Sequence, residues 1–234
     1  MNKTGFQPAQ TLGEIVAAFP QAADVFKSLG LDFCCGGSKT LKEAAGSKGI
    51  EEAIVLAKLE EKHTDYSQFG QPAKDWRNAP YAELISEIVN THHAYLLQEL
   101  APLEGYVAKI ARVHGPAHPE LIRVHELYRT MKAELEEHLV KEEEQLFPSI
   151  LSYADSEDEA DRAKAATLLK ELESEHAGVG EILREIRELT TDYTLPKEAC
   201  GTYRVSFERL KALESDMFDH IHLENNILFL RIAG

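Results

Sequence analysis

Two copies of a His-x-x-x-Glu pattern constrain the fold of this chain more than any other feature. The first copy is His138 to Glu142 and the second is His220 to Glu224, and each leads through polar residues to Leu-Phe. On an α-helix, positions four residues apart lie one turn apart on the same face, so each copy points an imidazole and a carboxylate in one direction. Two copies in two long helical segments suggest one shared site.

The two pairs are predicted to lie on buried helix faces. Winding the chain at about 100° per residue places His138 and Glu142 in the middle of an apolar stripe. The stripe contains Val124, Tyr128, Met131, Leu135 and Leu146. The same winding places Glu224 among apolar residues, with His220 at the margin. Such side chains are costly to bury unless they pair or bind a metal. A His–Glu hydrogen bond in the core explains a single copy, but the duplicate favours a metal.

Four long helical patterns follow Pro80. They cover residues 81–113, 119–153, 159–190 and 196–232. Short connections between such helices predict an all-α, up-down-up-down four-helix bundle over residues 81–234. Each helix is expected to place one histidine in the interior, and these are His92, His138, His176 and His220. The remaining histidines are expected in linkers, near helix ends or on outer faces, and these are His63, His93, His114, His118, His125 and His222.

A small helical domain is predicted over residues 1–62. Thr11-Leu-Gly-Glu14 and Thr40-Leu-Lys-Glu43 both fit the capping box, in which the two side chains satisfy each other's backbone donors. Residues 63–80 are polar and rich in proline and glycine, which indicates a linker. The small domain is marginal in size and is expected to need the bundle or a second chain to stay folded.

Adjacent cysteines lie within this small domain, in Asp32-Phe33-Cys34-Cys35-Gly36-Gly37. Neighbouring cysteines do not readily bridge to each other, and their spacing is not the Cys-x-x-Cys of zinc or thioredoxin sites. The two glycines leave the backbone free to adopt conformations closed to other residues. A reactive thiol pair and two small residues in a turn both fit the sequence. Cys200 is expected to be a packing residue.

Composition restricts the partners. The formal net charge of −15 argues against nucleic acid or an anionic membrane as a partner, since either requires a basic surface. Three cysteines, two of them adjacent, make no disulfide framework. Residues 1–10 show no secretory signal pattern, and no apolar run approaches membrane-spanning length. We therefore expect a cytoplasmic protein.

Four imidazoles and two carboxylates are too many ligands for one tetrahedral zinc ion. They suit two octahedral ions that share bridging carboxylates, and nitrogen and oxygen donors without thiolate favour iron or manganese. Because two carboxylates do not neutralise two divalent ions, an oxo or hydroxo bridge is expected. Ferritin-like sites use Glu-x-x-His, the opposite order, so ferroxidase and oxygenase chemistry are disfavoured.

The six candidate ligands resemble those of a known family. His92, His138-x-x-x-Glu142, His176 and His220-x-x-x-Glu224 resemble the hemerythrin-like di-iron bundle. Leu31-Asp-Phe-Cys34-Cys35-Gly-Gly, followed by Thr40-Leu, is similar to the cysteine module of the RIC (repair of iron centres) proteins. The segments 74–80 and 173–176 are similar to that family as well. Leu230 departs from the family, which tends to have proline after Leu-Phe.

This resemblance implies a non-haem di-iron centre in which Glu142 and Glu224 bridge two iron ions. It implies a role in repairing iron–sulfur clusters damaged by nitric oxide or oxidants, with Cys34 and Cys35 as functional thiols that handle iron or clusters. The implied partners are damaged iron–sulfur proteins, nitric oxide or dioxygen, and a second copy in a homodimer.

Other functions stay open at this stage. One is a reversible carrier or sensor of dioxygen or nitric oxide, although such bundles lack the cysteine module. Another is an enzyme that reduces nitric oxide at the two irons. A third is a structural bundle without metal, in which truncating His138 or His220 changes stability only slightly. Whether the protein is an enzyme is not decided by the sequence.

Overall fold

The computed structural model describes residues 5–70 and 74–234, and no β-strand occurs within these two ranges. Residues 71–73 of the predicted linker and residues 1–4 of the segment inspected for a secretory signal lie outside the described residues. The predicted all-α fold class is confirmed. Two compact units make up the fold: Tyr81–Met217, and the chain up to Pro80 together with Phe218–Gly234.

The first two arms of the bundle unit are helices that each contain a π-helical turn. The first arm consists of α5 (Tyr81–Glu87), η1 (Ile88–His93) and α6 (Ala94–His114). The second arm consists of α7 (Glu120–Lys141), η2 (Glu142–Leu146) and α8 (Phe147–Ser156). Neither arm ends at a proline. Pro102 lies within α6, and Pro148 lies in the first turn of α8, where the missing backbone N–H of proline destabilises a helix little.

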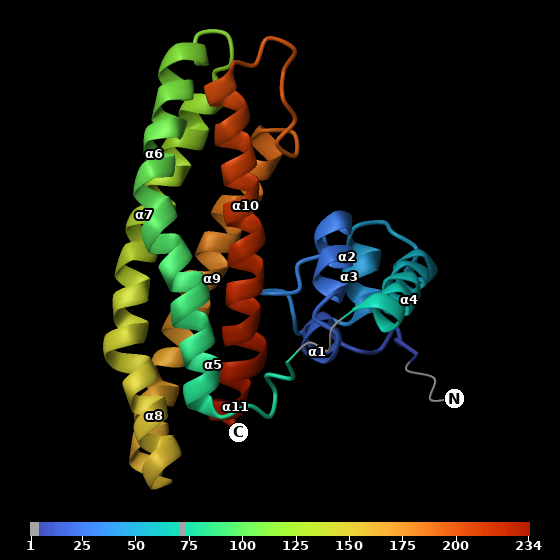
Figure 1. Cartoon of the computed structure of the whole chain (residues 1–234), viewed down its shortest axis with the longest axis vertical. Helices are drawn as coiled ribbons and strands as arrows, with labels where there is room; N and C mark the ends of the chain where they lie inside the picture. The colour runs from blue at the N-terminus through green and yellow to red at the C-terminus, as the bar shows by residue number, and fades with distance from the viewer. Residues whose placement is uncertain (1–4, 71–73) are drawn as a thin grey trace. The chain divides into compact units, whose positions relative to one another are not determined.

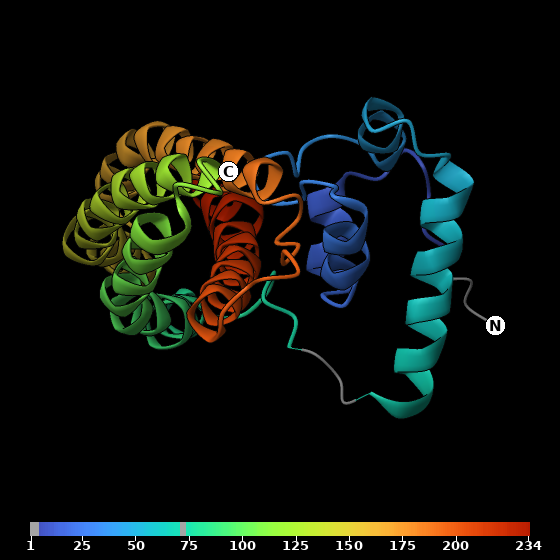
Figure 2. The same cartoon turned by 90° about the horizontal axis from the view of Figure 1, so that it is seen from above.

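The third arm is α9 (Glu159–Leu189), which begins where the side chain of Asp158 accepts a hydrogen bond from the backbone of Ala160. The fourth arm is α10 (Gly201–Leu223), of which residues 201–217 belong to the bundle unit. Figures 1 and 2 show the four arms running in alternating directions around a common axis. The predicted up-down-up-down bundle agrees with this arrangement.

Apolar packing and two ion pairs hold the four arms together. Helix α6 packs against α7, and both α7 and α8 pack against α9. Arg187 on α9 pairs with the buried carboxylate of Glu214 on α10. Arg209 on α10 pairs with Glu99 on α6, with Nη2 2.7 Å from Oε2. The bundle therefore has a closed interior to which each arm contributes.

The second unit contains α1 (Leu12–Ala18), α2 (Ala22–Leu29), α3 (Leu41–Ser47) and α4 (Glu52–Phe69). Both predicted capping boxes are present, at the starts of α1 and α3. Helix α4 continues to Phe69, so residues 63–69 are helical although the sequence placed them in the linker. The rings of His63 and Tyr66 lie 5.1 and 5.8 Å from the ring of Phe19, which holds this part of α4 in place.

The end of the chain belongs to the core of this second unit. It comprises the last turns of α10, the π-helical turn η3 (Glu224–Leu228) and α11 (Phe229–Ala233). Phe218 packs against the apolar core, with its ring 5.6 Å from that of Phe33. Lys27 pairs with Asp219 at 2.6 Å. The cysteine loop and the second His-x-x-x-Glu copy thus lie in the same unit.

Candidate metal centre and thiol loop

The three π-helical turns of the described chain coincide with candidate ligands. Turn η1 ends at His93, η2 begins at Glu142, and η3 begins at Glu224. A π-helical turn holds more residues than an α-helical one and is rare outside functional sites. Each turn also changes which of the following side chains face the interior. The two His-x-x-x-Glu copies share this feature, since a π-helical turn begins at the glutamate of each copy.

In the bundle unit, three buried imidazoles gather around one buried carboxylate. His93 Nε2 and His138 Nε2 each lie 3.4 Å from Glu142 Oε2. His176 Nε2 lies 2.9 Å from His138 Nε2. None of the four side chains is more than 3% exposed. Within this group, His138, Glu142 and His176 offer ligand atoms that all lie within 4.8 Å of one another. Such a concentration of buried polar groups is unfavourable unless they share a ligand.

His93, and not His92, contributes to this group. The sequence prediction named His92 as a ligand and placed His93 on an outer face. In the structure His93 approaches Glu142, whereas His92 Nδ1 lies 2.9 Å from Asp216 Oδ1. Both residues are buried and lie in η1, where winding at 100° per residue no longer holds, so the α-helical period directs the wrong one of the two toward Glu142. His93 therefore replaces His92 as the candidate ligand.

The second unit carries the other His-x-x-x-Glu pair. His220 Nε2 lies 3.0 Å from Glu224 Oε1, and both side chains are fully buried. His222 was predicted to be solvated, but it is buried as well, with its ring 5.7 Å from that of Phe33. Burial lowers the pKa of His222 to about 4. This imidazole is therefore a neutral core residue of the second unit at physiological pH.

Carboxylates hold the second ring nitrogen of two candidate ligands. His138 Nδ1 lies 2.7 Å from Glu175 Oε2, and His93 Nδ1 lies 2.8 Å from Glu143 Oε1. This arrangement fixes the tautomer and leaves each Nε2 available to a metal. Partial burial opposes ionisation of Glu175, but hydrogen bonds from Lys141 and His138 outweigh it and lower its pKa.

Helical spacing did not identify these carboxylates. It points instead to Glu134 and Asp216, which lie one turn before His138 and His220. Glu134 is exposed, and Asp216 contacts His92. Glu175 comes from α9, a different helix from that of His138, so no spacing within one helix reveals the contact. The only hint of this contact in the sequence is that Glu175 directly precedes His176.

The chemistry of the donors fits a transition-metal cation. The ligand groups offer imidazole nitrogen and carboxylate oxygen without thiolate, a set that suits iron or manganese. The two carboxylates, Glu142 and Glu224, are both fully buried. A buried carboxylate among imidazoles is the environment in which a bound cation offsets the cost of desolvation.

The thiol loop lies in the second unit, between α2 and α3. Cys34 is buried and Cys35 half-buried, no disulfide joins them, and their Sγ atoms are 3.8 Å apart. Asp32 Oδ1 accepts hydrogen bonds from the backbone N–H groups of Cys34 at 3.1 Å and Cys35 at 3.0 Å. Burial, followed by the nearby Cys35 and Asp32, raises the pKa of Cys34 well above its usual value. Cys34 is therefore a protonated thiol at neutral pH.

Asn226 holds this loop. Its Nδ2 donates hydrogen bonds to the carbonyl oxygens of Phe33 at 3.2 Å and Cys34 at 2.9 Å. A Cβ atom on Gly13 or Gly37 would lie only 2.4 or 2.1 Å from Asn226 Oδ1, so both positions require glycine. Asn226 lies in η3, two residues after Glu224. A single short segment therefore carries a candidate metal ligand and the anchor of the thiol loop.

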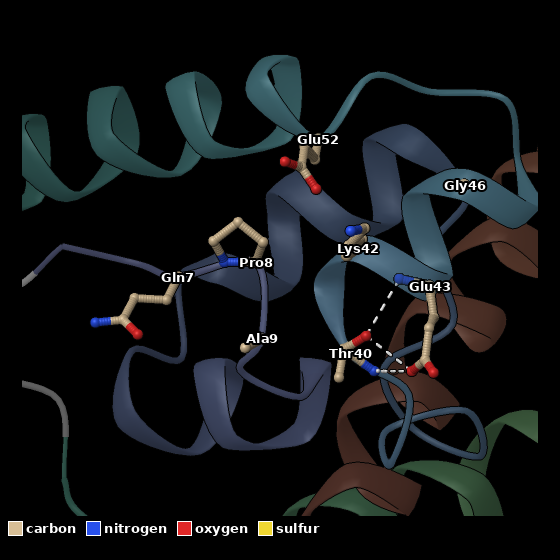
Figure 3. A pocket seen from close by; sticks show the side chains of 8 residues that line it. All are labelled: Gln7, Pro8, Ala9, Thr40, Lys42, Glu43, Gly46 and Glu52. Carbon is tan, nitrogen blue, oxygen red and sulfur yellow. Dashed lines mark hydrogen bonds between the residues drawn. The ribbon is translucent and has the colours of Figure 1, made fainter.

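Two other features lie apart from these groups. Cys200, predicted to be a packing residue, is exposed, and its Sγ lies 3.2 Å from His114 Nε2. The thiol is exposed because it directly precedes α10, at the end of a loop. Figure 3 shows a surface hollow of the second unit, in which Thr40 and Glu43 are already engaged in their capping box. None of the candidate ligands lines this hollow.

Helices long and apolar enough to cross a membrane do not occur in the described parts of the chain.

Two family models match the chain. Residues 8–63 match ScdA_N, described as a domain of unknown function, and residues 84–232 match the hemerythrin HHE cation binding domain. The second match alone covers more than half of the chain, and its range includes both His-x-x-x-Glu copies.

Three similar proteins match this chain over nearly their full length. The iron–sulfur cluster repair protein YtfE of Escherichia coli O157:H7 is 37% identical over 230 residues, which cover 96% of this chain and 97% of that protein. The iron–sulfur cluster repair protein ScdA of Staphylococcus haemolyticus is 35% identical over 222 residues, covering 95% and 97%. The protein of the same name from Staphylococcus epidermidis RP62A is 33% identical over 223 residues, with the same coverage.

Proposed function

Because this chain belongs to the family of iron–sulfur cluster repair proteins with a hemerythrin HHE domain, we propose that it repairs iron–sulfur clusters damaged by nitric oxide or oxidants. The observation that carries this proposal is similarity over nearly the full length of each relative, including the cysteine module. A carrier or sensor made of the bundle alone has no need of that module.

We further propose that the chain binds two iron ions through side chains of both His-x-x-x-Glu copies. The residues that would hold them are His93, His138, Glu142, His176, His220 and Glu224. The burial of all six groups supports this proposal, as does the range of the hemerythrin match, which includes both copies. The ions would supply exchangeable iron and a binding site for nitric oxide.

The surrounding residues have supporting roles in this proposal. Glu175 and Glu143 keep the imidazoles of His138 and His93 in the tautomer that binds a metal through Nε2. The burial of these six side chains excludes bulk water from them. Cys34 and Cys35 would receive or dock the damaged cluster, since soft thiolates are the natural ligands of iron–sulfur clusters.

A repair assay tests the proposal. A purified iron–sulfur enzyme inactivated by nitric oxide is incubated with the iron-loaded protein, and recovery of its activity is followed. We expect recovery with the wild type and with Cys200→Ala, little recovery with Glu142→Ala, and reduced recovery when Cys34 and Cys35 are both replaced by alanine. Full recovery with the double cysteine variant would refute the role of the thiols.

The same preparation distinguishes the alternative functions. Sustained consumption of nitric oxide with a reductant and no cluster substrate would favour a nitric oxide reductase. A stable and fully reversible dioxygen adduct would favour a carrier or sensor. We also propose a cytoplasmic homodimer, on the strength of the family resemblance. Gel filtration at twice the chain mass of 26.2 kDa would support the dimer.

A further inference from the structure

We propose that Asp32, Cys34 and Cys35 form a second metal site, which binds one thiophilic divalent cation such as Zn²⁺ or Fe²⁺ and is distinct from the di-iron centre. The two Sγ atoms and a carboxylate oxygen all lie within 4.8 Å of one another. The three residues are in one short loop of a single unit, so the site depends on no other part of the chain for its ligands.

The distances in the loop match those of a tetrahedral ion. Two thiolates about 2.3 Å from one tetrahedral ion lie about 3.8 Å apart. The Sγ atoms of Cys34 and Cys35 are 3.8 Å apart. A thiolate and a carboxylate oxygen on the same ion lie about 3.6 Å apart. Cys34 Sγ is 3.2 Å from Asp32 Oδ1, so binding requires an adjustment of only a few tenths of an ångström.

The loop is held in this conformation before any ion binds. The N–H groups of Cys34 and Cys35 fix the carboxylate of Asp32, and Asn226 fixes the carbonyl oxygens of Phe33 and Cys34. A backbone hydrogen bond of 2.9 Å from Gly13 to Gly37 closes the other side. A ligand set that is already ordered loses little conformational entropy on binding.

A cation explains this grouping better than a disulfide does. The Sγ distance of 3.8 Å is far from the S–S bond length of about 2.05 Å, so no disulfide joins the two cysteines. Three acidic groups side by side repel one another once ionised, and a divalent ion offsets that repulsion. Binding releases the thiol protons to solvent.

Three protein ligands leave the fourth tetrahedral position open. Structural zinc sites close this position with a fourth protein ligand, whereas open sites exchange ligands. Asp32 is exposed and Cys35 half-buried, so a donor from another molecule can approach the ion. The existence of the site stands on the geometry of the loop. Its use as a transfer point for iron rests on the function proposed above.

Titration of the purified full-length protein with Co²⁺ tests the site. Thiolate ligation gives a sulfur-to-cobalt charge-transfer band in the near ultraviolet, which the nitrogen and oxygen ligands of the bundle do not produce. We expect a band that saturates at one Co²⁺ per chain and is displaced by Zn²⁺. Cys35→Ser should abolish it, Asp32→Asn should weaken binding at least tenfold, and Cys200→Ala should leave it unchanged.

The outcomes separate this site from the proposed function. Absence of the band in the wild type, or its persistence in Cys35→Ser, would overturn the second site. Loss of the band in Cys200→Ala would assign it to another thiol and also overturn the proposal. Since Cys35 is half-buried, its replacement should leave the helical circular dichroism intact. If the wild-type protein shows the charge-transfer band but repairs no cluster, the second metal site is supported and the repair function is refuted.

Discussion

The Nε2 atom of His93 lies 3.4 Å from Oε2 of Glu142, although the two residues belong to different helices of the bundle. The adjacent imidazole of His92 is directed to Asp216 instead. Neighbouring histidines are thus divided between two partners at the end of one π-helical turn. Substitutions at these two positions therefore distinguish a metal ligand from a residue that only lies close to it.

We expect His93→Ala to lose bound iron and His92→Ala to retain it. Removal of the imidazole at position 93 takes a nitrogen donor from the group around Glu142. The loss of affinity should exceed the roughly 10- to 100-fold that follows loss of an outer-shell partner. Iron content after dialysis against a mild chelator measures the difference. Equal retention in both variants, or loss in His92→Ala alone, would show that the assignment is wrong.

Glu175→Gln should weaken iron binding by roughly 10- to 100-fold, because His138 loses the carboxylate that orients it. Glu171→Gln is the matched control. Both carboxylates pair with Lys141, but in the described contacts only that of Glu175 reaches His138. Competition with a chelator of known affinity gives the comparison. A similar loss in both variants would attribute the effect to Lys141 and not to the histidine.

Gly37→Ala should destabilise the second unit by about 1–3 kcal/mol, because a methyl group there collides with Asn226. Gly46→Ala is the control, since its Cβ meets no atom within 4 Å and lies within α3. That change should stabilise the unit by up to about 1 kcal/mol through helix propensity. Urea unfolding monitored by circular dichroism measures both. Unchanged stability in Gly37→Ala would show that the side chain of Asn226 does not lie against Gly37.

Arg187→Ala should destabilise the bundle by about 3 kcal/mol, because it leaves the buried carboxylate of Glu214 without its cation. Arg184→Ala, which removes an exposed pair with Glu181, should change the free energy of unfolding by less than about 1 kcal/mol. Thermal and urea unfolding of both variants provide the test. An equal effect would mean that the partly exposed guanidinium of Arg187 contributes no more than a surface pair.

Much of this architecture follows from patterns in the sequence. The apolar period after Pro80 predicts the four arms, and the two Thr-x-x-Glu boxes predict the starts of α1 and α3. His138, Glu142 and His176 were identified from the same period, because the helices that carry them are regular up to these residues.

The errors have two physical causes, a change of helical phase and contacts between segments far apart in the sequence. A π-helical turn leaves no signature in composition, yet it changes the phase of every side chain within it, so His92 was chosen in place of His93. His222 was placed outside because winding a single helix does not reveal that Phe33, from the thiol loop of the same unit, packs against its other face. Helix α4 extends beyond the expected boundary because aromatic contacts with Phe19 stabilise a polar segment. Tertiary contacts decided the last two of these cases.

The measurement that tests the central claim most directly is iron per chain, determined with Mössbauer spectroscopy on the wild type and on His176→Ala. If the six side chains hold a di-iron centre, the wild type contains two iron ions per chain in one coupled centre, and His176→Ala loses at least one of them. A wild-type protein from an iron-replete culture that contains no iron, or an unchanged spectrum in His176→Ala, would contradict the account.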